Sequence, residues 1–119
     1  MSENKEYVSR LQEQSNVHIS QEAICTVAAM AAVEVDGVTG LSHIGADIAA
    51  AKKNLSRAIR LRMEEENLIV DLSLVVKFGA NMQTVAANVQ DAVLASVESV
   101  TGLSVKTVNV HISGVAFDK

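Results

Sequence analysis

The sequence has no proline and no tryptophan, and aromatic residues of any kind are scarce. Only Tyr7, Phe78 and Phe117 are aromatic, 3% of the 119 residues. Proteins that bind single-stranded nucleic acid commonly stack its bases on flat rings, so this scarcity argues against a stacking platform. Apolar residues nevertheless make up 49% of the chain, too many for a disordered protein. The core must therefore be built from Val, Ile, Leu and Ala.

Cysteine and long apolar runs are also scarce. The single cysteine, Cys25, cannot form a disulfide within the chain. It lies in an Ala/Val-rich stretch without a flanking basic group, so we predict a small buried side chain and not a nucleophile. No apolar run approaches the roughly 18 residues that a membrane-spanning helix needs. The polar N-terminus lacks the apolar stretch of a secretory signal. We therefore expect a cytoplasmic protein.

Positive charge is in the minority. Ten basic and 14 acidic side chains give a net charge of −4 with histidine neutral, which argues against a general phosphate-binding surface. The length fits one domain. Residues 1–15 are polar and without strong periodicity, and we expect a flexible arm there. Residues 16–119 are expected to form the folded domain.

Two Ala/Val-rich segments repeat apolar residues at helical spacing, which predicts helices over 21–35 and 82–100. Ser20 and Asn81 are the predicted N-caps. Gly37 and Gly102 are expected where these helices end. The predicted inner stripes are Ile24, Val27, Ala28, Ala31 and Val35 in the first helix, and Val85, Val89, Ala92, Val93, Val97 and Val100 in the second.

Strict alternation of apolar and polar residues predicts strands over 58–64 and 68–78, which the polar turn at 65–67 joins into a hairpin. Shorter strands are predicted at 16–19, 38–44 and 104–113, whereas 45–54 fits either a short helix or a loop. The pentapeptide VTGLS at 38–42 recurs at 100–104, which supports two similar halves, although reuse of turn residues explains it as well. Together these patterns predict a small α+β domain with two helices on one face of a mixed sheet, two β-α-β-like halves and a central hairpin.

No arrangement of residues typical of catalysis is visible. His18 and His111 are predicted to face solvent, and they could bind a metal only if their strands were neighbours and further ligands joined them. Glu64, Glu65 and Glu66 are predicted to form a solvated turn, because paired catalytic carboxylates need an enclosing pocket. We therefore expect no catalytic residue, no metal, no cofactor and no small-molecule substrate.

Two weaker patterns remain as candidate binding features. The basic residues Lys52, Lys53, Arg57, Arg60 and Arg62 form either a solvated face or a contact for an acidic partner or anionic lipid. Gly37-Val38-Thr39-Gly40 has the GxxG form with which KH domains clamp a nucleic-acid backbone. It offers no positive charge, and a helix end followed by a strand explains the same residues.

The order of several segments resembles the alkaline-shock protein family, the envelope stress response proteins of Gram-positive bacteria. The segments are ISQEAI (19–24), EVDGV (34–38), NLSRAIRL (54–61), VDLSLVVKFG (70–79), VESVTGL (97–103) and VNVHISGVAF (108–117). The match extends over about residues 16–117. Two departures are Ala58, where the family commonly has Gly, and an Ala-rich variable segment at 45–53.

The resemblance implies a small α+β domain without known catalytic activity, abundant in the cytoplasm and tied to cell-envelope homeostasis. Some members self-assemble and associate with the membrane through a membrane-anchored partner. We therefore expect a non-enzymatic scaffold that forms homo-oligomers, contacts a small membrane-anchored protein and lies in the cytoplasm, peripherally at the inner face of the membrane. The alternative from the residues themselves is a small RNA-binding module that uses the KH-like GxxG loop.

Overall fold

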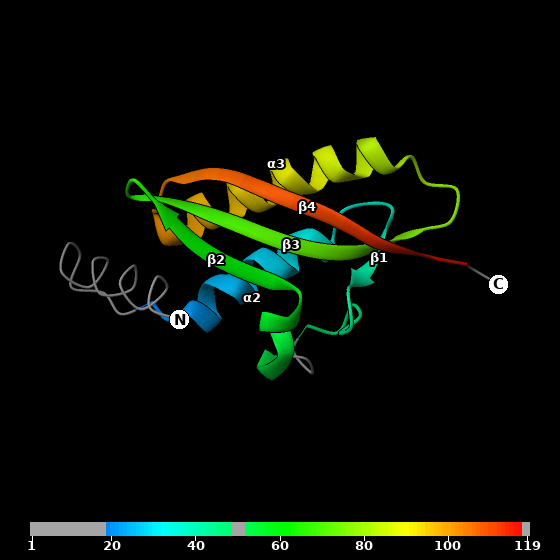
Figure 1. The fold of residues 1–119 in the computed structure, drawn as a ribbon, viewed down its shortest axis with the longest axis horizontal. Helices are drawn as coiled ribbons and strands as arrows, with labels where there is room; N and C mark the ends of the chain where they lie inside the picture. Colours follow the sequence, from blue (N-terminus) through cyan, green and yellow to red (C-terminus); the bar gives the residue numbers. More distant parts are fainter. Residues whose placement is uncertain (1–18, 49–51, 118–119) are drawn as a thin grey trace.

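A computed structural model describes residues 19–48 and 52–117 of the chain. In these residues, helices α2 (Gln21–Val33) and α3 (Met82–Thr101) lie side by side on one face of a four-stranded sheet (Figure 1). The predicted fold class, two helices on one face of a mixed sheet, is therefore confirmed. The arm predicted for residues 1–15 lies outside the described residues.

The sheet is built around one central strand. β3 (Asn67–Lys77) pairs antiparallel with β2 (Ile59–Glu64) along its first half and antiparallel with β1 (Val38–Leu41) along its second half. β4 (Val105–Ala116) runs parallel to β3 over nearly its whole length, so it occupies the opposite edge. The two short strands β1 and β2 therefore lie along one edge of β3, and the long strand β4 lies along the other.

The central hairpin is confirmed at its predicted position. Glu64 pairs with Asn67, so only Glu65 and Glu66 form the turn between β2 and β3. Alternate side chains of β3 point into the helix layer and are almost completely buried, since five apolar residues follow one another at period two: Leu68, Val70, Leu72, Leu74 and Val76.

Helix α3 follows its predicted pattern except at Ala92, which is half-buried, and at its last turn. The Asn81 side chain caps it by accepting a hydrogen bond from the Thr84 amide at 3.0 Å, and Gly102 ends it at φ +76°. The buried residues are four apart: Val85, Val89, Val93 and Val97. The predicted burial of Val100 is wrong, because its side chain is 66% exposed. Each step of four residues turns the stripe by about 40°, which carries it toward Thr101 and leaves Val100 outside.

Helix α2 buries a different stripe from the predicted one. The Ser20 hydroxyl caps it as expected, accepting from the Ala23 amide at 3.0 Å. The buried residues are Ile24, Cys25, Ala28, Ala29 and Ala32, whereas Val27 and Ala31 are only half-buried. Because the helix is apolar on nearly all sides, its sequence pattern defined the inner face poorly. The small side chains of the actual stripe let α2 lie close to α3 and the sheet.

Between the helical and hairpin regions, several predicted boundaries shift. The strand predicted to reach residue 44 ends at Leu41, where the amides and carbonyls of Leu41 and Gly45 exchange hydrogen bonds of 2.9 Å. A 3-10 helix, η1 (Lys52–Arg57), precedes β2. The strand predicted at 16–19 lies outside the described residues except for Ile19, which is not in a strand.

The repeated pentapeptide does not occupy equivalent positions. Its first copy forms β1, whereas its second copy ends α3 and leads into β4. Gly40 is therefore a buried strand residue and Gly102 a left-handed helix cap. Reuse of residues suited to turns and strands explains the echo.

Candidate interaction surfaces

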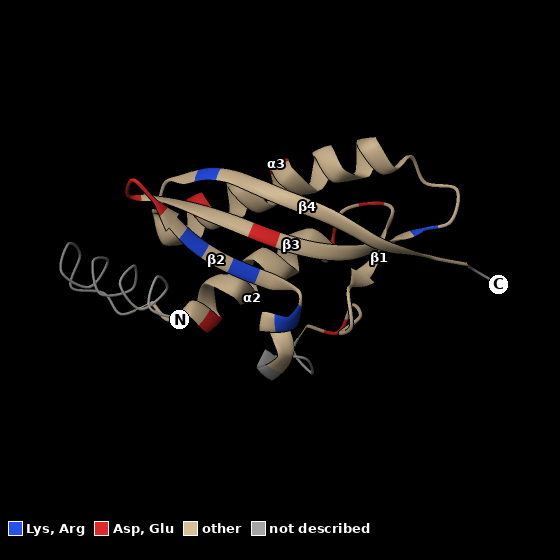
Figure 2. Ribbon diagram, viewed as in Figure 1, with Lys and Arg blue, Asp and Glu red and all other residues tan. Residues whose placement is uncertain are grey.

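The predicted basic residues follow one another along η1 and β2. Arg60 and Arg62 alternate with buried residues of β2, so their side chains lie on the sheet face that does not carry the helices, and Arg57 ends η1 next to this strand. Figure 2 shows the basic segments of η1 and β2 in blue. Lys52 and Lys53 begin η1, but their side chains lie outside the described part of the structure. We call Arg57, Arg60 and Arg62 the basic ridge. The alternation of β2 creates it, because Ile59 and Leu61 point into the core and their neighbours point out.

One of the three arginines is tied to a carboxylate on the neighbouring strand. Arg62 Nε lies 3.1 Å from Asp71 Oδ2, and the Asn109 side-chain amide donates to Asp71 Oδ1 at 2.7 Å. Partial burial raises the pKa of Asp71, but the hydrogen bonds from Asn109 and Arg62 outweigh it and hold the pKa below its usual 3.8. Asp71 therefore links β2, β3 and β4 across the face, and the carboxylate stays ionised at neutral pH.

A hollow of about 330 Å³ lies beside this group, where β3 exchanges β2 for β1 as its neighbour. Its lining includes Arg57, Arg60, Ser73 and His111, with Asp71 at one side. The Ser73 amide donates to the Ala58 carbonyl, and the Ser73 carbonyl accepts from the Ser42 amide. The hollow therefore offers two guanidinium groups, a hydroxyl and an imidazole to a ligand, a set suited to an anion. We call it the basic hollow.

The free edge of β4 is the second surface. Its neighbour β3 covers one side only, and among the described residues no strand pairs with the other side. The Gln90 side-chain amide of α3 donates to the Val108 carbonyl at 3.0 Å, so this carbonyl points away from β3. Alternate residues of a strand direct their backbone groups to the same side, and Val110 and Ile112 therefore also face the free edge. Register shifts near residues 106 and 113 bound this regular stretch.

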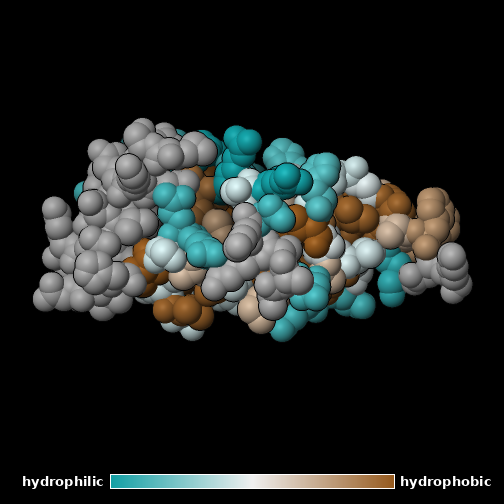
Figure 3. Space-filling model, turned by 90° about the horizontal axis from the view of Figure 1, so that it is seen from below, coloured by the Kyte–Doolittle hydropathy of each residue, from teal (hydrophilic) through white to brown (hydrophobic). Residues whose placement is uncertain are grey.

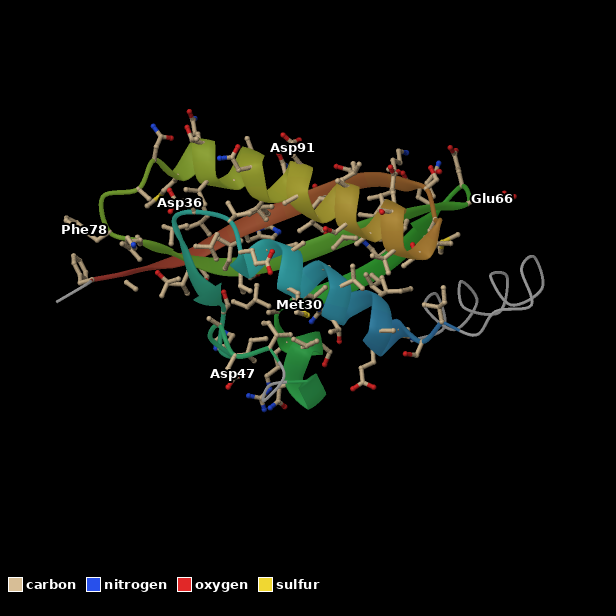
Figure 4. The ribbon with its side chains drawn as sticks, turned by 180° about the vertical axis from the view of Figure 1, so that it is seen from behind. Met30, Asp36, Asp47, Glu66, Phe78 and Asp91 are labelled. Carbon is tan, nitrogen blue, oxygen red and sulfur yellow. The ribbon has the colours of Figure 1, made fainter. Side chains whose placement is uncertain are left out.

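An exposed aromatic pair forms a third feature. Phe78 follows β3 and Phe117 follows β4, and their rings lie 4.7 Å apart between centroids with a tilt of 31°. These residues are 62% and 72% exposed, and Figure 4 shows Phe78 at the end of the sheet. Figure 3 shows hydrophobic surface at the same end of the molecule. Sequence reasoning missed this pair, although the fact that each Phe directly follows a strand was a usable signal.

The glycines of the GxxG pattern serve packing. Gly37 has φ +96°, and a Cβ there would lie 2.7 Å from Val85 Cγ2. Gly40 is buried in β1, and its Cβ would lie 2.6 Å from the Gly45 carbonyl carbon. A positive φ and the close approach of the Val85 side chain therefore account for Gly37, and a close approach between backbone segments accounts for Gly40.

The remaining chemically interesting side chains have structural environments. Cys25 is buried, and desolvation together with the charge of Glu22 raises its pKa to about 11, so it is a thiol at neutral pH. Its predicted role as buried filler is confirmed. His111 is exposed as predicted, and His18 lies outside the described residues. Within residues 19–48 and 52–117, no group of three or more His, Cys, Asp or Glu side chains is placed to hold a metal ion.

In the described residues, the fold and these surfaces define a small two-layer α+β domain with one sheet face that carries no helix and a free strand edge. The chain belongs to the ASP23 family of alkaline-shock proteins, because the model of that family matches residues 9–117. The family is described as having a cell envelope-related function. Over the same described ranges, no helix is long and apolar enough to cross a membrane.

Similar proteins agree with this assignment. The chain is 35% identical over 104 residues to the uncharacterized protein YloU of Bacillus subtilis, covering 83% of this chain and 87% of that protein. It is 33% identical over 105 residues to YqhY of the same organism, covering 86% and 78%. Two solved structures of MamM-CTD variants share the fold with TM-scores of 0.50, at 21% and 19% identity; both cover 79% of this chain, and 96% and 98% of their own.

Proposed function

We propose that this protein is a non-enzymatic scaffold in cell-envelope homeostasis and stress, which acts through self-association and through a membrane-anchored partner. The family assignment supports the envelope role. The free edge of β4 supports self-association, and it is the observation that carries the proposal. The protein works in the cytoplasm and reaches the inner face of the membrane through its partner.

The β4 edge is self-complementary in one antiparallel register. If two copies pair around Val110, then Val108 lies opposite Ile112 of the second copy, and Asn109 lies opposite His111. Apolar side chains thus meet on the helix side of the sheet, and uncharged polar or titratable ones meet on the uncovered side. This register places no two positively charged side chains opposite each other and no two negatively charged ones. The pairing makes a continuous sheet across two copies and satisfies backbone groups that a lone edge leaves to water.

The edge is tested by removing one outward-facing amide. Val110→Pro deletes an N–H that points away from β3, so the hydrogen bonds to β3 are kept. The pairing with a second copy loses the hydrogen bonds at its central residue. Val110→Thr keeps the amide and the shape and serves as the matched control. Sedimentation equilibrium of the full chain is expected to show a dimer for the native protein and for Val110→Thr, and a monomer for Val110→Pro. A native monomer at high concentration would contradict the proposal, as would a Val110→Pro dimer.

The partner contact is assigned to the basic ridge. Affinity capture from native cells, with the membrane fraction retained, compares the native chain with Arg57→Glu/Arg60→Glu. Recovery of a small membrane protein by the native chain alone supports the proposal. Recovery of RNA without any membrane protein would contradict it.

A further inference from the structure

The turn between β2 and β3 carries two glutamates in a backbone conformation that favours other residues. Glu65 has φ +51° and Glu66 φ +72°. Two-residue hairpin turns with positive φ at both positions strongly favour Asn-Gly or Gly-Gly, because side chains with a Cβ are strained there. Neither carboxylate makes a hydrogen bond or an ion pair with a described residue, and Glu66 points away from the molecule at the free end of the hairpin (Figure 4). The charge of Glu65 helps to raise the pKa of Lys106, whereas no contact with a described residue accounts for Glu66.

Glu64, next to the turn, differs from its neighbours because it is paired. Its carboxylate accepts a hydrogen bond from Lys106 of β4, and this hydrogen bond lowers the pKa of Glu64. The Lys106 contact joins the base of the hairpin to β4. The two turn carboxylates are therefore held at the end of a supported hairpin. We call Glu65 and Glu66 the acidic turn.

The basic hollow has the opposite charge and is similarly uncommitted. Asp71 lines the hollow too, but its carboxylate is bound by Arg62 and Asn109 and makes no ion pair with Arg57 or Arg60. Arg57 and Arg60 have no hydrogen-bonded or ionic partner among the described residues. The hollow measures about 330 Å³ and opens on the uncovered sheet face. It therefore presents two guanidinium groups to whatever acidic group reaches it.

The acidic turn cannot reach the hollow of its own chain. The turn follows the last residue of β2, and the hollow lies at the start of the same strand. A strand rises about 3.3 Å per residue, so the six residues of β2 separate the two by about 20 Å. A rigid hairpin does not fold back over its own face. The charges can therefore meet only between molecules.

We propose that the acidic turn of one copy docks into the basic hollow of another, with Glu65 and Glu66 against Arg57 and Arg60. This rests on the proposed self-association and deepens it, because it names a second copy of this chain as one occupant of Arg57 and Arg60, for which the membrane-anchored partner competes. The contact joins two different patches, so each copy keeps one unused patch and the assembly continues head to tail. Exposed ion pairs are individually weak, and the contact acts where copies are concentrated or where dimers engage it twice.

Charge reversal with rescue tests this contact. Glu65→Arg/Glu66→Arg and Arg57→Glu/Arg60→Glu each place like charges against each other, and the variant with all four substitutions restores opposite charges with the polarity exchanged. In sedimentation velocity at about 50 mM salt, we expect the native protein to form species larger than the dimer. Each double variant should weaken this association roughly tenfold or more. The fourfold variant, and an equimolar mixture of the two double variants, should recover it.

A matched control separates this contact from a general charge effect. Asp36→Arg/Asp91→Arg changes the net charge as much as the acidic-turn variant does, at two exposed sites away from the hairpin (Figure 4). This control variant is expected to form at least as much of the species larger than the dimer as the native protein does. At about 1 M salt, where screening acts within about 3 Å, the larger species should dissociate to the dimer.

The outcomes distinguish this contact from β4 pairing. A native protein that stops at the dimer would overturn the head-to-tail contact and leave β4 pairing intact, as would double variants that still form the larger species. A fourfold variant that folds but does not recover assembly would also overturn it. Loss of dimer in Val110→Pro, with charge-dependent association retained, supports both contacts independently.

Discussion

At the scale of single residues, the acidic turn combines backbone strain with exposed charge. A left-handed conformation costs an L-residue with a Cβ about 1–2 kcal/mol, whereas Gly tolerates it and Asn adopts it more readily than most residues. Glu65→Asn/Glu66→Gly is therefore expected to raise the free energy of unfolding by about 1–2 kcal/mol, measured by urea denaturation. The same substitution removes both carboxylates and should abolish the larger species in sedimentation. A less stable variant would mean that the turn is not strained by its native residues.

Asp71 predicts how stability depends on pH. Its folded pKa lies below the unfolded value, so its ionised form stabilises the fold above the unfolded pKa of 3.8 and this contribution is lost as the pH falls through the folded pKa. Urea denaturation between about pH 6 and pH 2.5 should show stability falling toward the acid end. Asp71→Asn should make that fall shallower, at a cost of less than about 1 kcal/mol at neutral pH because the pair is partly exposed. An unchanged slope would contradict the assigned role of Asp71.

At the scale of elements, the same valine-to-alanine substitution can be made at a buried and at an exposed position of helix α3. Val93 is completely buried and Val100 is 66% exposed on the same helix. Val93→Ala removes two methyl groups from a packed core and is expected to cost about 2–3 kcal/mol. Val100→Ala makes the same change at the surface and should alter stability by less than about 0.5 kcal/mol. Thermal or urea unfolding gives both values, and equal losses would contradict the stripe described for α3.

The same helices mark what the sequence could predict. The α3 stripe was predicted well because polar residues separate its valines, whereas α2 is apolar on most sides and its inner face depends on which side meets α3. Strict alternation predicted β3 and the hairpin because the two helices cover only one face of that sheet. The parallel placement of β4 against β3 comes from the crossover through α3, and no local pattern encodes it.

The interaction surfaces were only partly predictable for a related reason. The alternation along β2 is a local pattern, and it was enough to place Arg60 and Arg62 on one face. The contacts of Asp71 with Asn109 and of Gln90 with Val108 join residues that are distant in sequence. Such contacts depend on register, which a single sequence does not specify. The shared face of Arg60 and Arg62 was therefore predicted correctly, but the hollow beside it became visible only from the fold.

At the scale of the whole molecule, Gln90 limits how readily β4 edges meet. Its amide occupies the Val108 carbonyl that a second copy would use. Gln90→Ala frees this carbonyl in both copies of a dimer, and since each hydrogen bond contributes about 1 kcal/mol net, dimerisation should strengthen roughly thirtyfold. Gln83→Ala, an exposed change on the same helix, is the matched control. Sedimentation equilibrium measures both, and weaker dimerisation of Gln90→Ala would contradict pairing through this edge.

Every described strand pair includes β3, and this determines the order in which the sheet can form during synthesis on the ribosome. β1 precedes β3 in the chain and β2 forms a local hairpin with it, so both can pair as soon as β3 emerges. The other edge of β3 must wait for α3 and β4, 39 residues from Lys77 to Ala116. At roughly 5–20 residues per second this interval lasts about 2–8 s. During that time the nascent chain displays a long apolar strand with one edge unpaired, a state that is prone to aggregation.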